Sequence, residues 1–236
     1  MTISPKDRII FALDVPDVAE AARFAGLLKD HVGMFKIGLE LFVACGPEIV
    51  KAVRERGGRG IFLDLKFHDI PETVKGAMRS ASTLGADLVT VHTSDGQAMM
   101  KAAVEAAGSA KVLGVTVLTS LSAEAFPEAG IDKGFTPASL VLHRARVAKS
   151  AGCAGIVCSG QEARAARDAL GPDFLIVTPG VRSADDAVGD QKRVVTPFEA
   201  VKNGADYIVV GRPIRNAPNP VEAAKRIAAE IEKTGC

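Results

Sequence analysis

Short apolar runs alternate with longer amphipathic segments along almost the whole chain. The runs are rich in β-branched residues and apolar on both faces, as is typical of strands buried beneath helices in a parallel sheet. The segments between them carry apolar residues at helical spacing, as in Val18–Lys29, Glu48–Arg56 and Gln97–Ala107. This alternation predicts an α/β fold, either a closed (β/α)8 barrel or an open doubly wound sheet. We predict strands at Ile9–Asp14, Met34–Gly38, Gly60–Lys66, Leu88–His92, Val112–Leu118, Gly155–Cys158, Phe174–Thr178 and Tyr207–Val210.

Helix start signals support this division. Thr196-Pro197-Phe198-Glu199 combines a capping threonine, a proline at the first helical position and a glutamate that completes a capping box. Thr136-Pro137 and the segment from Asn219 to Glu222 repeat the pattern. We find no linker or change of composition, so we predict one domain over residues 1–236. Two connections, Thr119–Thr136 and Gly180–Thr196, are longer than simple turns and are expected to be functional loops.

Composition restricts the possible functions. Hydrophobic residues make up 47% of the 236 residues, as in ordinary globular proteins, and 29 Lys and Arg nearly balance 28 Asp and Glu. Without a basic tail or tryptophan, nucleic-acid binding is not expected. No leader or membrane segment is evident, so we expect a cytoplasmic protein without membrane contact. The four cysteines, Cys45, Cys153, Cys158 and Cys236, have no zinc-ligand spacing, and we expect reduced structural thiols.

Charged residues occur at the ends of strands that are otherwise apolar. Asp14 closes the first strand, Lys36 lies in the second, and Asp64 and Lys66 close the third. Carboxyl ends of parallel strands share one rim, and residues two apart on a strand face the same way. We therefore predict a cluster of alternating carboxylates and ammonium groups, with Asp69 three residues further on. Because burying such charges is costly, a purely structural role is the weaker interpretation.

Glycine and arginine follow the last two strands. Thr178-Pro179-Gly180-Val181-Arg182 follows the seventh strand, and Gly211-Arg212 follows the eighth. Glycine lets backbone N–H groups approach an anion, and arginine offers a bidentate cationic fork. The loops after strands seven and eight are also the usual phosphate site of barrel enzymes. The pattern predicts a phosphate-binding site.

The segment Asp64–Thr73, of sequence DLKFHDIPET, resembles the Asp-x-Lys-x-x-Asp signature of the orotidine 5'-monophosphate decarboxylases. The resemblance extends through Lys36-Ile37-Gly38, Leu118-Thr119-Ser120, Thr178–Arg182, Asp190-Gln191 and Val210-Gly211-Arg212. It implies a single (β/α)8 barrel that decarboxylates orotidine 5'-monophosphate to UMP, the last step of de novo UMP synthesis. It also implies a homodimer that uses neither metal nor organic cofactor.

The resemblance implies a role for each matching position. Lys66 would donate the proton, flanked by Asp64 and by Asp69 from the partner subunit, with Lys36 completing the network. Asp14 and Lys36 would hold the ribose hydroxyls, and Thr73 would reach the partner's site. Thr119 would contact the pyrimidine, with Ser122 as a further candidate. The phosphate would be held by Arg182, Gln191, Gly211 and Arg212.

Other interpretations stay open at this point. A Mg2+-dependent sugar-phosphate decarboxylase or aldolase, such as 3-keto-L-gulonate 6-phosphate decarboxylase, shares the signature. A non-catalytic sensor of nucleotide phosphates would need the arginines but not the Asp/Lys cluster, and barrels of tryptophan or histidine synthesis lack the charged third strand. We expect structural or solvent-facing roles for His68 and His92.

Overall fold

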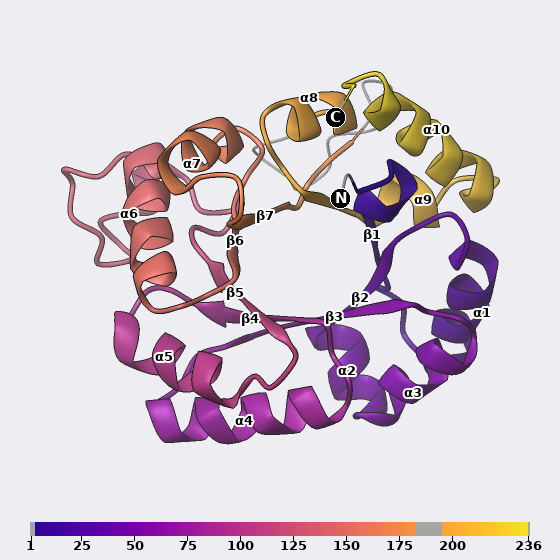
Figure 1. The fold of residues 1–236 in the computed structure, drawn as a ribbon, viewed down its shortest axis with the longest axis horizontal. Coiled ribbons are helices and arrows are strands. Elements are labelled where there is room, and N and C mark those ends of the chain that lie inside the picture. The colour runs from indigo at the N-terminus through magenta and orange to yellow at the C-terminus, as the bar shows by residue number, and fades with distance from the viewer. Residues whose placement is uncertain (1–2, 183–194, 236) are drawn as a thin grey trace.

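The computed structural model describes residues 3–182 and 195–235. Eight parallel strands close into one barrel in chain order, and helices surround it on the outside (Figure 1). This confirms the (β/α)8 barrel and excludes the open sheet. The strands are β1 (Ile9–Ala12), β2 (Met34–Gly38), β3 (Gly60–Phe67), β4 (Leu88–His92), β5 (Lys111–Val115), β6 (Gly155–Val157), β7 (Leu175–Thr178) and β8 (Tyr207–Val210).

Most helices follow the predicted segments closely. The predicted starts at Val18, Glu48 and Gln97 agree with the structure, and each of these helices ends one residue earlier than expected. The helical elements are η1 (Lys6–Arg8), α1 (Val18–Leu28), α2 (Leu39–Cys45), α3 (Glu48–Glu55), α4 (Pro71–Thr83), α5 (Gln97–Ala106), η2 (Ala123–Ala125), α6 (Pro137–Ser150), α7 (Ala163–Leu170), α8 (Pro197–Lys202), α9 (Arg212–Arg215) and α10 (Pro220–Glu232). No helix of the described residues is long and apolar enough to cross a membrane.

The predicted helix caps form. Thr196 accepts a hydrogen bond from the Glu199 N–H, and the Glu199 side chain accepts one from the Thr196 N–H. Thr136 makes the same reciprocal pair with Ser139 at the start of α6. Asn219 caps α10 through its side-chain oxygen. Each cap satisfies N–H groups that lack a partner in the first helical turn, so local sequence fixes where these helices begin.

Apolar residues fill two regions. Inside the barrel, Ile10, Phe62, Leu113 and Val177 pack against one another. A second, larger core lies between the barrel and its helices. Lys36 pairs in register with Ala12 and Phe62, two residues of the interior cluster. Its side chain therefore rises from the barrel interior, which explains why so little of it meets solvent.

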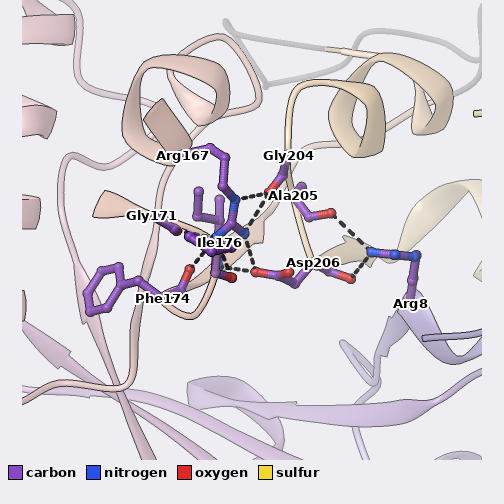
Figure 2. Close-up of polar contacts among 9 residues, drawn as sticks. Arg8, Arg167, Gly171, Phe174, Ile176, Gly204, Ala205 and Asp206 are labelled. Atoms are coloured by element: carbon purple, nitrogen blue, oxygen red, sulfur yellow. Dashed lines mark hydrogen bonds and ion pairs between the residues drawn. The ribbon is translucent and has the colours of Figure 1, made fainter. Parts of the chain in front are cut away.

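At the amino end of the barrel, an arginine anchor joins β7 to β8 (Figure 2). Arg167 at the end of α7 donates to the Asp206 carboxylate at 2.6 Å and to the main-chain oxygens of Gly171, Phe174 and Gly204. The same carboxylate accepts the N–H of Ile176 at the start of β7. The arginine guanidinium has enough N–H donors to form hydrogen bonds with several backbone carbonyls at once.

A second anchor repeats this arrangement between β3 and β4. Arg54 of α3 donates to the Asp87 carboxylate at 2.9 Å and to the carbonyl of Gly85, and Asp87 accepts the N–H of Ile61. In both anchors the aspartate immediately precedes a strand and ends a Gly-Ala-Asp tripeptide. The two anchors lie four strands apart in the barrel.

Two predicted strand ends are wrong by more than one residue. β1 ends at Ala12, so Asp14 lies two residues beyond the strand that we expected it to close. We expected a strand at Val112–Leu118, but β5 ends at Val115, where the N–H and hydroxyl of Thr116 both bond to the Val157 carbonyl. The third strand forms where it was predicted and is one residue longer, and its register against β4 shifts between Leu63 and Phe67, which is a β-bulge.

Candidate active site

Two lysines and two aspartates meet at the carboxyl end of the barrel, as predicted. The Lys66 ammonium lies 2.9 Å from Asp64 Oδ1, and the Lys36 ammonium lies 3.8 Å from Asp64 Oδ2. Lys36 also contacts Asp14 Oδ1 at 3.1 Å. We call these four residues the Asp/Lys cluster. Asp64 stands at its centre, with one oxygen facing each lysine.

The cluster is partly withdrawn from water. The side chain of Lys36 is only 11% exposed and that of Asp64 16%, whereas the Lys66 side chain is 29% exposed. An ammonium buried to this degree is stable only when carboxylates pair with it, and Lys36 has two. Asp14, which is about half exposed, forms the solvent side of the cluster.

Lys66 has an unusual backbone. Its φ is +49°, the one positive value at a non-glycine residue within the described ranges. A side chain in this left-handed region costs about 1–3 kcal/mol, and such residues are found where surrounding structure holds them for a function. The strained residue lies in the β3 bulge. The bulge therefore presents the Lys66 ammonium to Asp64 at the price of local strain.

An arginine compartment of about 470 Å³ opens beside the cluster. It is lined by Arg182 and Arg212, by the Gly180 and Gly211 backbones, and by residues of the cluster itself. Arg182 is almost fully buried, although it is charged. Two arginines and two glycine turns around one cavity are suited to a dianion such as a phosphate group. The structure thus brings together the arginines and glycines predicted for phosphate binding.

A smaller apolar compartment of about 200 Å³ adjoins it. Lys36, Pro179 and Val209 line both spaces, so the two form one continuous site. The smaller space is closed mainly by Phe62, Val115, Val117, Leu118, Val157 and Val209, with Asp64, Lys66 and Thr119 as polar members. An apolar space with a few polar groups is typical of sites that bind small molecules.

Some predicted site residues lie elsewhere. Asp69 and Thr73 are exposed, and the Asp69 carboxylate accepts the N–H of Ile70. Ser122 lines neither compartment. Gln191 lies outside the described residues, together with most of the connection in which it was predicted.

His68 and His92, which lie near the carboxyl ends of β3 and β4, form a group apart from the Asp/Lys cluster. His68 bonds to the Asp95 carboxylate, and its ring lies 5.2 Å from that of His92. Burial lowers the pKa of His92, and the nearby His68 and Lys66 lower it further. The hydrogen bond from His68 lowers the pKa of Asp95. Neither histidine lines the arginine or the apolar compartment.

Sequence reasoning missed several residues of the site. Glu40 and Arg215 line the arginine compartment, and Arg215 donates to the main-chain carbonyl of Asp14. Thr90, fully buried in β4, bonds to Asp64. A threonine in a strand has no distinguishing sequence signal, but the arginine three residues after Gly211-Arg212 could have been found. Within residues 3–182 and 195–235, no group of three or more His, Cys, Asp or Glu side chains is arranged to hold a metal ion.

The fold and site define the general class. This is a (β/α)8-barrel enzyme with its charged groups at the carboxyl ends of the strands, where enzymes of this fold hold their substrates.

Comparison with known proteins gives the family. Residues 7–227 match the model of the "Orotidine 5'-phosphate decarboxylase / HUMPS family". The chain is 52% identical, over 96% of its length, to the orotidine 5'-phosphate decarboxylase of Moorella thermoacetica and covers 93% of that protein. It is 54% identical, over 97% of its length, to that of Anaeromyxobacter sp. (strain K), which it covers completely (100%). A crystal structure of orotidine 5'-phosphate decarboxylase from Lactobacillus acidophilus matches with a TM-score of 0.82 and 35% identity, covering 94% of this chain and 98% of that one. The chain belongs to the orotidine 5'-phosphate decarboxylase / HUMPS family.

Proposed function

We propose that this chain decarboxylates orotidine 5'-monophosphate to UMP and CO2, the last step of de novo UMP synthesis. The observation that carries the proposal is the Asp/Lys cluster at the junction of an arginine compartment and an apolar one. The names of close relatives point the same way. We further propose that the whole chain acts as one catalytic domain, and a cytoplasmic location stays a prediction.

The two compartments suggest how the nucleotide binds. The phosphate would lie in the arginine compartment against Arg182, Arg212 and the Gly211 backbone, with Gln191 as a further predicted contact. The ribose hydroxyls would meet Asp14 and Lys36, which line the same space. The pyrimidine would enter the apolar compartment beside Thr119. In this pose the carbon that carries the carboxylate faces Lys66.

Lys66 would supply the proton. When the bond between C6 and the carboxylate breaks, CO2 leaves and the electron pair stays on C6. The Lys66 ammonium, held 2.9 Å from Asp64, stabilises this negative charge and then transfers a proton to C6. Solvent reprotonates the neutral amine after product release. Lys36 adds a second fixed positive charge to the same cluster and holds Asp64 in place.

The phosphate lies away from the bond that breaks, and its binding would serve catalysis indirectly. Contacts with a remote group can be used to organise the reacting groups and to exclude water. The shared wall of Lys36, Pro179 and Val209 offers a short physical link between the two ends of the substrate.

A direct assay tests the proposal. Purified protein, treated with EDTA and dialysed, is mixed with orotidine 5'-monophosphate, and its ultraviolet absorbance is followed as UMP forms. We expect turnover at the same rate before and after EDTA treatment. Loss of activity that Mg2+ restores would instead favour a metal-dependent relative. Binding of the nucleotide without any turnover would favour a sensor.

We also propose a homodimer in which Asp69 and Thr73 complete the partner's site. The carboxyl end of the barrel carries exposed Leu39, Val43 and Ile70, each more than half exposed. Leu39 and Val43 are four residues apart on α2 and share one helix face. Asp69 and Thr73 flank Ile70 and are themselves exposed, so a second subunit on this apolar surface could receive them.

Mixing of inactive variants tests the shared site. Lys66→Ala and Asp69→Ala homodimers should each be inactive. After subunit exchange, about a quarter of the sites would combine intact Lys66 with intact Asp69, because half of the dimers are mixed and each has one such site. Recovery of activity supports a shared site, and a monomeric protein in sedimentation experiments would contradict it.

A further inference from the structure

Thr90 connects two parts of the Asp/Lys cluster although it belongs to neither compartment. It lies in the middle of β4 and is fully buried. Its hydroxyl donates to Asp64 Oδ1 at 3.0 Å and accepts the main-chain N–H of Lys66 at 2.9 Å. One hydroxyl thus holds the carboxylate of one catalytic residue and the backbone of the other.

The β3 bulge explains why this hydroxyl is needed. Leu63 pairs with Val89 and Phe67 with Val91, so Asp64, Leu65 and Lys66 all lie opposite the single residue Thr90. The bulge interrupts the regular ladder at this point. A buried N–H without a partner is costly, and the Thr90 hydroxyl supplies the partner for the Lys66 N–H.

The second hydrogen bond orients Asp64. Its Oδ1 accepts from both Thr90 and the Lys66 ammonium, while Oδ2 faces Lys36. A carboxylate held only by the ends of two long lysine side chains could rotate about its terminal torsion. The Thr90 hydroxyl, fixed on a barrel strand, removes that freedom and so sets the direction in which Asp64 holds the Lys66 ammonium.

We propose that Thr90 is a positioning residue for decarboxylation, acting through Asp64 and Lys66 without touching the substrate. This inference rests on the proposed function. It requires a side chain that donates and accepts at once within the volume of threonine. Serine meets that requirement, whereas valine has the shape without either capacity and cysteine bonds only weakly.

The test compares Thr90→Val and Thr90→Ser with a matched control. Thr93→Val removes another buried hydroxyl just beyond β4, one that donates to the Val115 carbonyl at 2.8 Å and lies outside both compartments. We expect Thr90→Val to lower kcat by about 10- to 100-fold, the range for losing a hydrogen bond to a charged group. KM and the dissociation constant of UMP should change by less than about threefold, because the compartment walls stay intact. Thr90→Ser should restore most of kcat, and Thr93→Val should keep it.

The outcomes separate the possible failures. If the unmodified protein does not turn over orotidine 5'-monophosphate, the proposed function fails. If it does and Thr90→Val keeps its kcat, or loses no more than Thr93→Val at equal thermal stability, the role of Thr90 is refuted. Should Thr90→Val not fold, Thr90→Cys against Thr90→Ser poses the same question with closely matched side chains. Equal kcat in that pair would refute the proposal.

Discussion

Replacing Lys66 by alanine tests the catalytic role of its ammonium without relieving the strain of the left-handed backbone at this position. Lys66 has a φ of +49°, and alanine carries the same Cβ in that conformation. The strain therefore stays, and the side chain beyond Cβ is removed together with its ammonium. Glycine at the same position removes the ammonium and also the strain, since it adopts positive φ freely. The pair Lys66→Ala and Lys66→Gly separates the two properties of this residue.

The expected size of each effect follows from the site. A unit charge about 4 Å from the developing negative charge is worth roughly 4 kcal/mol at an effective dielectric constant near 20, or about 10³-fold in rate. Loss of the proton donor costs a further 10²- to 10⁴-fold or so. Because one group does both, the losses overlap, and we expect kcat to fall by at least about 10⁴-fold in both variants.

The thermal stability of the two variants should differ, although both lose activity. Relief of the left-handed conformation is worth roughly 1–2 kcal/mol, partly offset by the greater freedom of glycine in the unfolded chain. Lys66→Gly should thus unfold at a temperature about 2–4 °C above that of Lys66→Ala. Ultraviolet turnover assays and thermal unfolding by circular dichroism measure both quantities. Near-normal turnover in either variant, or a lower unfolding temperature for the glycine variant, would refute the reasoning.

Three further predictions concern other parts of the chain. Arg212→Ala should lower kcat/KM by orders of magnitude, and added phosphite dianion should restore part of it in a turnover assay; a variant unaffected by both would contradict phosphate binding in the arginine compartment. Arg167→Ala should destabilise the fold by about 3 kcal/mol in urea unfolding, with KM unchanged, while the more exposed Arg54 should matter less. Burial raises the pKa of the Cys153 thiol to about 12, so it stays neutral at pH 8 and should resist iodoacetamide in the folded protein, while the partly exposed Cys45 should react faster than Cys153 in peptide mapping.

The sequence predicted the barrel because its signals are local and repeated. Apolar runs located the strands, and capping residues such as Thr136 and Thr196 located helix starts to the residue. It also predicted that Asp14, Lys36, Asp64 and Lys66 would meet, because parallel strands end at a common rim.

Features that depend on the pairing of neighbouring strands could not be predicted from the sequence. The bulge of β3 exists only relative to its pairing with β4, so no pattern in the sequence of the third strand itself predicts it. Thr90 was missed because its role arises from facing that bulge, and nothing in its own strand marks it. The short helix α2 was not predicted either, since it follows a strand without a turn and has no side-chain cap.

The two arginine anchors stabilise the amino end of the barrel, whereas the candidate active site lies at its carboxyl end. In a ring of eight strands, the pairs β3–β4 and β7–β8 lie opposite each other, so the amino end is fastened at two points across its diameter (Figure 1). The strained backbone of Lys66 lies at the opposite, carboxyl end of the barrel. The two anchors at the amino end resist separation of the strands there. Loops at the carboxyl end are then free to change in length and sequence while the base keeps the strands in register.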